Sequence, residues 1–328
     1  MAWVLGIDLG GTKVSAAVLD PAGRIAGRAR AKTKAWRNDE DVFGTIARTG
    51  HQAIENAGLQ LAGLSAVGIG SPGPLDPVAG YIIESANLKF KNFPLGPRLA
   101  QEFGVTTTVE NDVNAGLYGE FKAGAARGAR DVLGVFVGTG IGGGLILNGR
   151  LYRGASLNAG EVGHIIVEAG GPRCGCGNRG CLEALASRVA ISREVKLAIK
   201  RGRKTVLSKR LKKQTDLLSS NDLKDAYFEG DAVAVKVMNR AAKALGIALG
   251  SLVNLLGPEM IVLGGGVIEA LGVEYVDRIG SATRRIAFDI CGRDLKILKA
   301  ELGDDAGVIG AAMLARESLN AGAIERPQ

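Results

Sequence analysis

Four residues able to bind one metal ion lie within a single stretch of the chain, residues 158–187. This stretch contains one of the two histidines and three of the four cysteines. The imidazole and three thiols suit a closed, tetrahedral zinc site; these residues are His164, Cys174, Cys176 and Cys181. Glycines between the cysteines permit a tight turn that brings three sulfurs together. Disulfides or a loop of free thiols are the alternatives, but no secretory leader is recognisable, which disfavours disulfides.

Two carboxylates flank the predicted zinc ligands. Glu161 lies three residues before His164, and Glu183 lies two residues after Cys181. A metal ion that fixed His164 and Cys181 would hold both carboxylates near one spot, while the second imidazole nitrogen could bond outward. Such a set suits a polyhydroxyl ligand such as a sugar. The alternative is that Glu161 and Glu183 are supporting or surface residues, and spacing alone does not decide between the two.

Two glycine-rich turns, each between predicted strands, could hold phosphate through backbone N–H groups. The first is Asp8-Leu9-Gly10-Gly11-Thr12-Lys13, between strands at 3–9 and 14–19. The second begins Gly138-Thr139-Gly140 and runs to Gly144, between strands at 132–137 and 145–147. Asp8 could hold Mg²⁺ through water. Many tight hairpins contain Gly-Gly, so each turn alone is a weak signal, but the pair predicts an internal duplication.

Two further loops follow predicted strands. Glu110-Asn111-Asp112-Val113-Asn114 joins a strand at 106–109 to a helix that continues through Phe121. An acid there could do chemistry, as in open α/β sheets, or could simply cap the helix; the local pattern favours the cap slightly. Gly264-Gly265-Gly266 follows a strand at 259–263. Bare backbone there could approach a flat ring such as adenine, and a plain loop is the alternative.

Length and composition indicate a soluble, cytoplasmic protein of two domains. The chain has 328 residues, of which 46% are hydrophobic, and no apolar run reaches membrane-spanning length. The net charge of +8 could indicate nucleic-acid binding, but residues 193–213 carry +9 and the remainder only −1. This distribution favours a solvated face or loop over a polyanion-binding domain. Cys291 and His51 are interpreted as an ordinary buried thiol and a surface histidine.

Hydrophobic periodicity predicts the remaining elements. Further strands are expected at 24–31, 64–70 and 295–299. Further helices are expected at 41–57, 95–103, 188–200, 222–229, 232–256, 273–286 and 305–316.

Taken together, these motifs resemble those of the ROK sugar kinases, within the actin-like, hexokinase-type ATPase superfamily. The resemblance covers nearly the whole chain and rests on both glycine turns, the 110–114 run, Gly160-Glu161-Val162-Gly163-His164, the cysteine cluster through Glu183, and Leu263-Gly264-Gly265-Gly266. It implies an α/β fold of two ribonuclease-H-like lobes with the active site in the cleft between them. Residues 1–112 plus 305–328 would form the smaller lobe. Residues 113–304 would form the larger lobe, with the zinc knuckle and dimerisation helices.

The resemblance also implies roles for the candidate residues. Asp112 would be the general base in transfer from ATP-Mg²⁺ to a hexose hydroxyl. The sugar ligands would be Asn87, Asn111, Asp112, Glu161, His164 and Glu183, with His164 also bound to a structural zinc ion. The nucleotide ligands would be Asp8, Gly10, Gly11, Thr12, Lys13, Gly138, Thr139, Gly140, Gly264, Gly265 and Gly266.

Within the family, the motifs match best the glucokinases that act on the 6-hydroxyl of glucose. They also fit N-acetylmannosamine, and mannose and fructose are further candidates. The basic segment leaves polyphosphate open as the phosphoryl donor. Other ROK proteins are sugar-responsive repressors with an N-terminal helix-turn-helix domain, for which no room precedes Asp8. The alternative from a different class of protein is a sugar-sensing regulator without enzymatic activity. The family suggests a homodimer, and neither a membrane nor nucleic acid is an expected partner.

Overall fold

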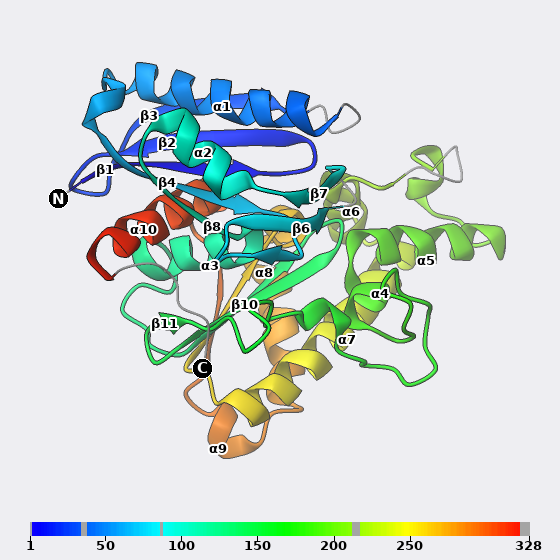
Figure 1. Ribbon diagram of the computed structural model, residues 1–328. Helices are drawn as coiled ribbons and strands as arrows, with labels where there is room; N and C mark the ends of the chain where they lie inside the picture. Colours follow the sequence, from blue (N-terminus) through cyan, green and yellow to red (C-terminus); the bar gives the residue numbers. More distant parts are fainter. Residues whose placement is uncertain (1, 34–37, 86–87, 212–216, 322–328) are drawn as a thin grey trace. The chain divides into compact units, whose positions relative to one another are not determined.

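Two five-stranded sheets repeat one strand order along the chain. The first has the order β3-β2-β1-β4-β8 and the second β11-β10-β9-β12-β13. In both, an antiparallel hairpin is followed by strands that pair in parallel. The repeat agrees with the duplication inferred from the two glycine turns. The computed structural model describes residues 2–33, 38–85, 88–211 and 217–321 (Figure 1).

The chain folds into two compact units. The first contains Met1–Gly128, Arg150–Ala159 and Asp304–Gln328, and the second contains Ala129–Gly149 and Gly160–Gly303. Residues 113–128 and 150–159 therefore pack with the first unit, beyond the boundary at residue 112 expected from the sequence.

The first unit is a mixed sheet with helices on both faces. Its sheet strands are β1 (Trp3–Leu9), β2 (Lys13–Leu19), β3 (Ile25–Lys32), β4 (Leu64–Ser71) and β8 (Thr106–Asn111). Its helices are α1 (Asp39–Asn56), α2 (Leu95–Phe103), α3 (Asp112–Ala123) and α10 (Ala306–Ala321). Figure 1 shows α1 and α10 on opposite sides of this sheet. A small sheet of β5 (Leu75–Asp76), β6 (Tyr81–Ser85) and β7 (Phe90–Phe93) adds to the unit.

Helix α10 lies unusually close to the first sheet because glycines face it. A Cβ atom on Gly6 of β1 would lie 1.9 Å from the Val308 carbonyl oxygen, and one on Gly68 of β4 would lie 1.9 Å from that of Ala311. On the helix itself, a Cβ on Gly310 would lie 1.7 Å from the Ala115 oxygen of α3. Backbone therefore packs directly on backbone where α10 crosses β1, β4 and α3, and no side chain fits between them.

The second unit places its helices around the second sheet. Its strands are β9 (Val132–Val137), β10 (Ile141–Leu147), β12 (Met260–Gly264) and β13 (Lys296–Lys299), and β11 (Arg150–Leu151) follows β10. Its helices are α4 (Leu182–Ala186), α5 (Arg188–Lys200), α6 (Ser220–Phe228), α7 (Ala232–Leu256), α8 (Gly266–Arg284) and α9 (Asp289–Gly292). Buried aliphatic side chains of the sheet, α7 and α8 form one core.

Two expected boundaries in this unit are wrong. Strand β10 begins at Ile141 rather than Leu145, so its three glycines belong to the strand. Helix α8 begins at Gly266 rather than Val273, with a non-helical break at Gly272, where φ is +71°. The described residues also form the 3₁₀ turns η1 (Leu61–Gly63), η2 (Val162–His164), η3 (Val206–Lys209) and η4 (Gly303–Asp305). Among the described residues, no helix combines the length and apolar character needed to cross a membrane.

Candidate functional site

The predicted base, Asp112, is the first residue of α3, directly after β8. Asn111 caps the helix, because its side-chain oxygen accepts from the N–H groups of Val113 (3.0 Å) and Asn114 (3.1 Å). The carboxylate of Asp112 itself accepts from the Val113 N–H at 2.9 Å. The capping function therefore belongs mainly to Asn111, which leaves Asp112 in the first turn, where the partial positive charge of the helix stabilises a carboxylate.

Asp8, the second-last residue of β1, lies close enough to Asp112 for their charges to interact. Burial, and then repulsion by Asp112, raise the pKa of Asp8 from 3.8 to about 6. A site in which two carboxylates repel in this way favours a bound cation. Two hydrogen bonds of Gly10 hold the following turn in place. Its N–H donates to the Lys13 oxygen (2.9 Å), and its oxygen accepts from the Thr33 hydroxyl (2.6 Å).

Lys13, predicted to contact nucleotide, begins β2 and is already paired. Its ammonium lies 2.8 Å from Asp304, and this bond holds the pKa of Asp304 below its usual range. Gly11 and Thr12 complete the turn between β1 and β2. The N–H of Thr33 donates to the Thr12 oxygen at 3.0 Å, so the turn is attached to the end of β3 as well as to its own hairpin.

In the second unit, the equivalent turn at Gly138-Thr139-Gly140 joins β9 to β10. The Gly138 N–H donates to the Gly140 oxygen at 2.9 Å. Arg188, at the start of α5, binds the same turn twice, from its backbone N–H to the Gly138 oxygen (3.0 Å) and from its guanidinium to the Thr139 hydroxyl (2.8 Å). The turn is thereby fixed to the N-terminal end of α5.

The predicted adenosine loop lies beside this turn. Gly264 ends β12, Gly265 has φ +85°, and Gly266 begins α8. A Cβ on Gly265 would lie 2.7 Å from both the backbone nitrogen and the oxygen of Val137, the residue before Gly138. The structure thus brings together two of the predicted nucleotide motifs, separated by more than a hundred residues in the sequence.

The four predicted metal ligands also come together. Their ligand atoms all lie within 4.8 Å of one another. The Sγ atoms of Cys176 and Cys181 are 3.7 Å apart, and Cys174 Sγ is 3.8 Å from His164 Nδ1. Tetrahedral zinc with bonds of about 2.3 Å to sulfur separates two ligand atoms by about 3.8 Å. The donor set and its spacing therefore fit zinc, with His164 coordinating through Nδ1.

The two flanking carboxylates lie next to this cluster, as the spacing predicted. Glu161 Oε2 is 3.9 Å from His164 Nε2, the ring nitrogen that faces away from the cysteines. Glu183 Oε1 is 3.9 Å from Cys174 Sγ, while its Oε2 accepts from the Ile141 N–H at 3.0 Å. Glu183 therefore connects the cysteine cluster to the glycine turn between β9 and β10.

Close packing fixes the turn that carries Glu161 and His164. A Cβ on Gly163 would lie 2.2 Å from the Ile141 oxygen, and a Cβ on Gly143 would lie 2.3 Å from Val162. Gly143 of β10 and Gly163 of the turn thus allow Val162–His164 to pack directly against the strand. This contact is the physical reason for glycine at position 143, which sequence analysis assigned to a loop.

Two charged residues to which the sequence assigned no role lie beside the Asp112 junction. Glu110 is buried, and its carboxylate accepts from Arg153 Nε at 2.7 Å. Glu110 was visible only as part of the motif around Asp112. Nothing in the spacing links it to Arg153, 43 residues later.

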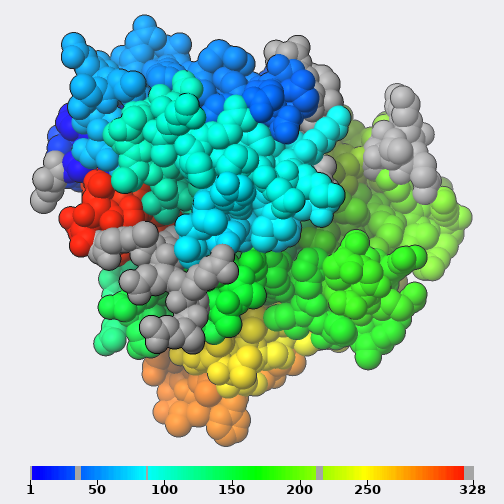
Figure 2. Space-filling model, viewed as in Figure 1, coloured from blue at the N-terminus to red at the C-terminus, as the bar shows by residue number. Residues whose placement is uncertain are grey.

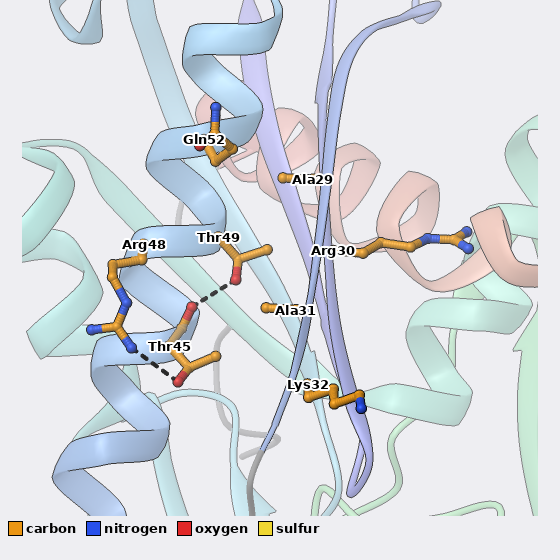
Figure 3. A pocket seen from close by; sticks show the side chains of 8 residues that line it. All are labelled: Ala29, Arg30, Ala31, Lys32, Thr45, Arg48, Thr49 and Gln52. Atoms are coloured by element: carbon orange, nitrogen blue, oxygen red, sulfur yellow. Dashed lines mark hydrogen bonds between the residues drawn. The ribbon is translucent and has the colours of Figure 1, made fainter.

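Some predicted features lie elsewhere. Asn87 and the end of the basic segment, Lys212 and Lys213, fall outside the described residues. A pocket of about 480 Å³ in the first unit contains none of the predicted site residues. Figure 3 shows it between β3 and α1, with Ala29 and Ala31 pointing towards the helix and Arg30 away from it. Its lining offers neither a carboxylate nor a thiol.

Comparison with known proteins identifies relatives over nearly the whole chain. The sequence profile of the ROK family matches residues 4–318. The glucokinase of Halalkalibacterium halodurans is 33% identical over 319 residues, covering 97% of this chain and 96% of that protein. The xylose repressor of Caldicellulosiruptor bescii is 29% identical, covering 97% of this chain and 79% of that protein. A ROK family glucokinase from Streptomyces griseus, crystallised with glucose and AMPPNP, superposes with a TM-score of 0.81 at 34% identity, covering 96% of this chain and all of that one.

Proposed function

Because the chain belongs to the ROK family and has its actin-like two-lobe fold, we propose that it is a kinase that transfers the γ-phosphoryl group of ATP to the 6-hydroxyl of glucose. The orientation of His164 carries the proposal: Nδ1 faces Cys174, while Nε2 faces Glu161. A metal ion on one side of this ring leaves the other nitrogen to a sugar hydroxyl, beside a carboxylate that accepts from the same sugar.

The zinc ion supplies rigidity rather than chemistry in this proposal. His164, Cys174, Cys176 and Cys181 would hold the ion, and coordination through Nδ1 would leave the proton of the imidazole on Nε2. His164 then donates to a sugar oxygen, and Glu161 and Glu183 accept from sugar hydroxyls. Asn87, Asn111 and Asp112 complete the proposed sugar ligands. The proposal requires that both units present these residues to one sugar.

Asp112 is the proposed general base. Its carboxylate accepts the proton of the 6-hydroxyl as that oxygen forms a bond to the γ-phosphorus and the bond to the β-phosphate oxygen breaks, which gives glucose 6-phosphate and ADP. The fixed position of Asp112 in the first turn of α3, with Asn111 as the cap, supports this role. A base held in one position avoids the entropic cost of finding the productive geometry.

The glycine turns are the proposed phosphate sites. Gly10, Gly11, Thr12 and Lys13 in the first unit, and Gly138, Thr139 and Gly140 in the second, would bind phosphates through N–H groups and hydroxyls. Gly264, Gly265 and Gly266 would bind adenosine. Magnesium bound to ATP supplies charge neutralisation for the phosphates. Asp8 is the residue that would hold it through water, and its raised pKa is the physical sign that a cation is favoured there.

Other hexoses and a sensor role are the competing functions. Mannose, fructose and N-acetylmannosamine also present hydroxyl groups that the same ligands could bind. Polyphosphate is an alternative phosphoryl donor, and only the basic segment 193–213 suggests it. The match to a xylose repressor favours a sugar-sensing role as the second candidate. The presence of Asp112 and both glycine turns favours the kinase, because a sensor needs neither a base nor phosphate loops.

A coupled ADP-release assay tests the proposal. The protein, with its zinc content measured, is given ATP-Mg²⁺ and, in turn, glucose, mannose, fructose, N-acetylglucosamine and N-acetylmannosamine. We expect the highest kcat/KM for glucose, with polyphosphate unable to replace ATP. Absence of turnover on every sugar, combined with glucose binding in calorimetry, would instead establish the sensor.

We also propose that the protein is a homodimer. Three large apolar side chains of the second unit are strongly exposed at the end of α7 and around α9: Leu255 (76%), Phe288 (68%) and Ile290 (70%). Figure 2 shows α9, in orange, at the surface. Burying such side chains against a second copy removes apolar area from water. Sedimentation of the wild type and Phe288→Glu tests this, with a monomeric wild type contradicting it.

A further inference from the structure

Within the first unit, the buried ion pair of Glu110 and Arg153 connects the junction that carries Asp112 to the loop of residues 153–159. Glu110 is 1% exposed and Arg153 is 17% exposed at its side chain. A buried carboxylate is costly unless its oxygens are fully bonded, so a pair of this kind is held in one geometry. Glu110 lies next to Asn111, which has a proposed role, and Arg153 begins the loop that ends at Ala159; neither partner touches sugar or nucleotide in that proposal.

On one side, Glu110 fixes the junction that carries Asp112. Its Oε1 accepts from the backbone N–H of Asn111 (3.0 Å) and from the side-chain amide of Asn114 (3.0 Å). Asn111 and Asn114 lie immediately before and two residues after Asp112. The carboxylate of Glu110 therefore holds the chain on both sides of the base.

On the other side, Arg153 fixes the loop that leads into the sugar motif. The Arg153 oxygen accepts from the Ala159 N–H at 2.9 Å, which closes the loop of residues 153–159. Asn158 attaches the same loop to the backbone of Leu75, at 3.4 and 3.5 Å. After Ala159 the chain leaves the first unit, and Glu161 is the second residue beyond that point.

We propose that Glu110 and Arg153 are positioning residues for the phosphoryl transfer, which tie the base Asp112 to the loop that delivers Glu161 and His164. The inference rests on the proposed function. It assigns the ion pair a role in aligning the attacking hydroxyl with its base, in addition to any contribution to folding. Misalignment of these two parts by about 1 Å is expected to cost one to two orders of magnitude in rate.

Two variants separate positioning from stability. Arg153→Met leaves the Glu110 carboxylate buried without its partner, so we expect a lower urea midpoint and a lower kcat. The double variant Glu110→Gln/Arg153→Met buries no charge, and the oxygen of the introduced amide can still accept from Asn111 and Asn114. We expect it to regain most of the lost stability, while kcat stays at least about tenfold below wild type and the KM for glucose rises about fivefold.

Controls identify which step has failed. The KM for ATP should stay within about twofold, because the residues at 138–140 and 264–266 belong to the other unit and the bonds of the ion pair given above go to Asn111 and Asn114, not to the turn at residues 10–13. Arg153→Lys should recover part of kcat, since an ammonium can still reach the carboxylate. Arg98→Met removes an ion pair with Glu40 in the same unit and should leave both constants unchanged.

Two results would overturn the inference. Recovery of kcat together with stability in the double variant would make the ion pair purely structural while leaving the kinase intact. Absence of turnover by the wild type in the same assay would remove the proposed function itself, and the positioning role with it.

Discussion

Substitution of Gly163 by alanine tests whether the turn at Val162–His164 is the sugar site. The added Cβ would lie 2.2 Å from the Ile141 oxygen. Cβ atoms essentially never come within 3.0 Å of a heavy atom outside their own residue and its two chain neighbours. The turn must therefore move by about 0.8 Å. Gly143, on the same strand as Ile141, also packs closely against the turn, because a Cβ there would lie 2.3 Å from Val162.

The shift predicts the size of the effect. A hydrogen bond of about 2.8 Å lengthened by about 0.8 Å is no longer a hydrogen bond. Loss of two bonds to the sugar, each contributing about 1–1.5 kcal/mol, costs about 2–3 kcal/mol. This corresponds to a fall of about 30- to 150-fold in kcat/KM for glucose.

The coupled ADP-release assay gives kcat/KM, and urea unfolding and the bound zinc are measured on the same samples. Gly44→Ala in α1 is the matched control, because it adds the same methyl group but meets only the end of the Arg48 side chain, at 3.2 Å. We expect the control to keep full activity. A folded Gly163→Ala variant with kcat/KM within threefold of wild type would refute either the packing argument or the location of the sugar site.

The remaining predictions concern the base, the metal, a buried acid and the packing of α10. Asp112→Asn should abolish turnover but leave glucose binding measurable by calorimetry; retained full activity would refute the base assignment. Cys176→Ser should lose zinc and weaken glucose binding together, and a zinc-free variant with an unchanged KM would break that link. The folded-state pKa of Asp8, about 6, exceeds its ordinary value of 3.8. Between these pH values the folded state therefore binds more protons than the unfolded state, so the free energy of unfolding should fall by about 2–3 kcal/mol as pH rises from 4 to 6. Asp8→Asn should remove that fall in urea unfolding, and an unchanged pH dependence would contradict the assignment. Gly310→Ala should destabilise by at least about 2 kcal/mol despite the gain in helix propensity, whereas Gly44→Ala, with the same propensity gain, should be neutral or stabilising in the same urea titration.

Features set by local spacing could be predicted from the sequence. The zinc ligands lie within one short loop, so residue type and glycine content were sufficient to identify them. The two glycine turns identified the duplication, because each turn needs only its own flanking strands. The cap and the base at Asn111 and Asp112 could not be separated by pattern, since both lie at the same strand–helix junction; the structure assigns the main capping bonds to Asn111.

Features set by tertiary packing could not be predicted. The start of α8 was placed too late because Gly272 interrupts the helical pattern, although the chain resumes the helix on its far side. The glycines of β10 were predicted to be a loop because the sequence does not show that Val162 and the Gly160 oxygen lie against Gly143, where they leave no space for a side chain. The pairing of Glu110 with Arg153 depends on the path of residues 150–159, which no periodicity specifies.

The backbone contact of α10 with β1 and β4 has a consequence for synthesis on the ribosome. The strands of the first sheet are made early, but the helix that covers the face of Gly6 and Gly68 follows residue 303, the end of the second unit. A chain that ends at residue 303 therefore contains the whole second unit, but its first sheet lacks the helix that covers one apolar face. A purified chain truncated after residue 303 should consequently bind chaperones through that face and be protease-sensitive in the first unit alone.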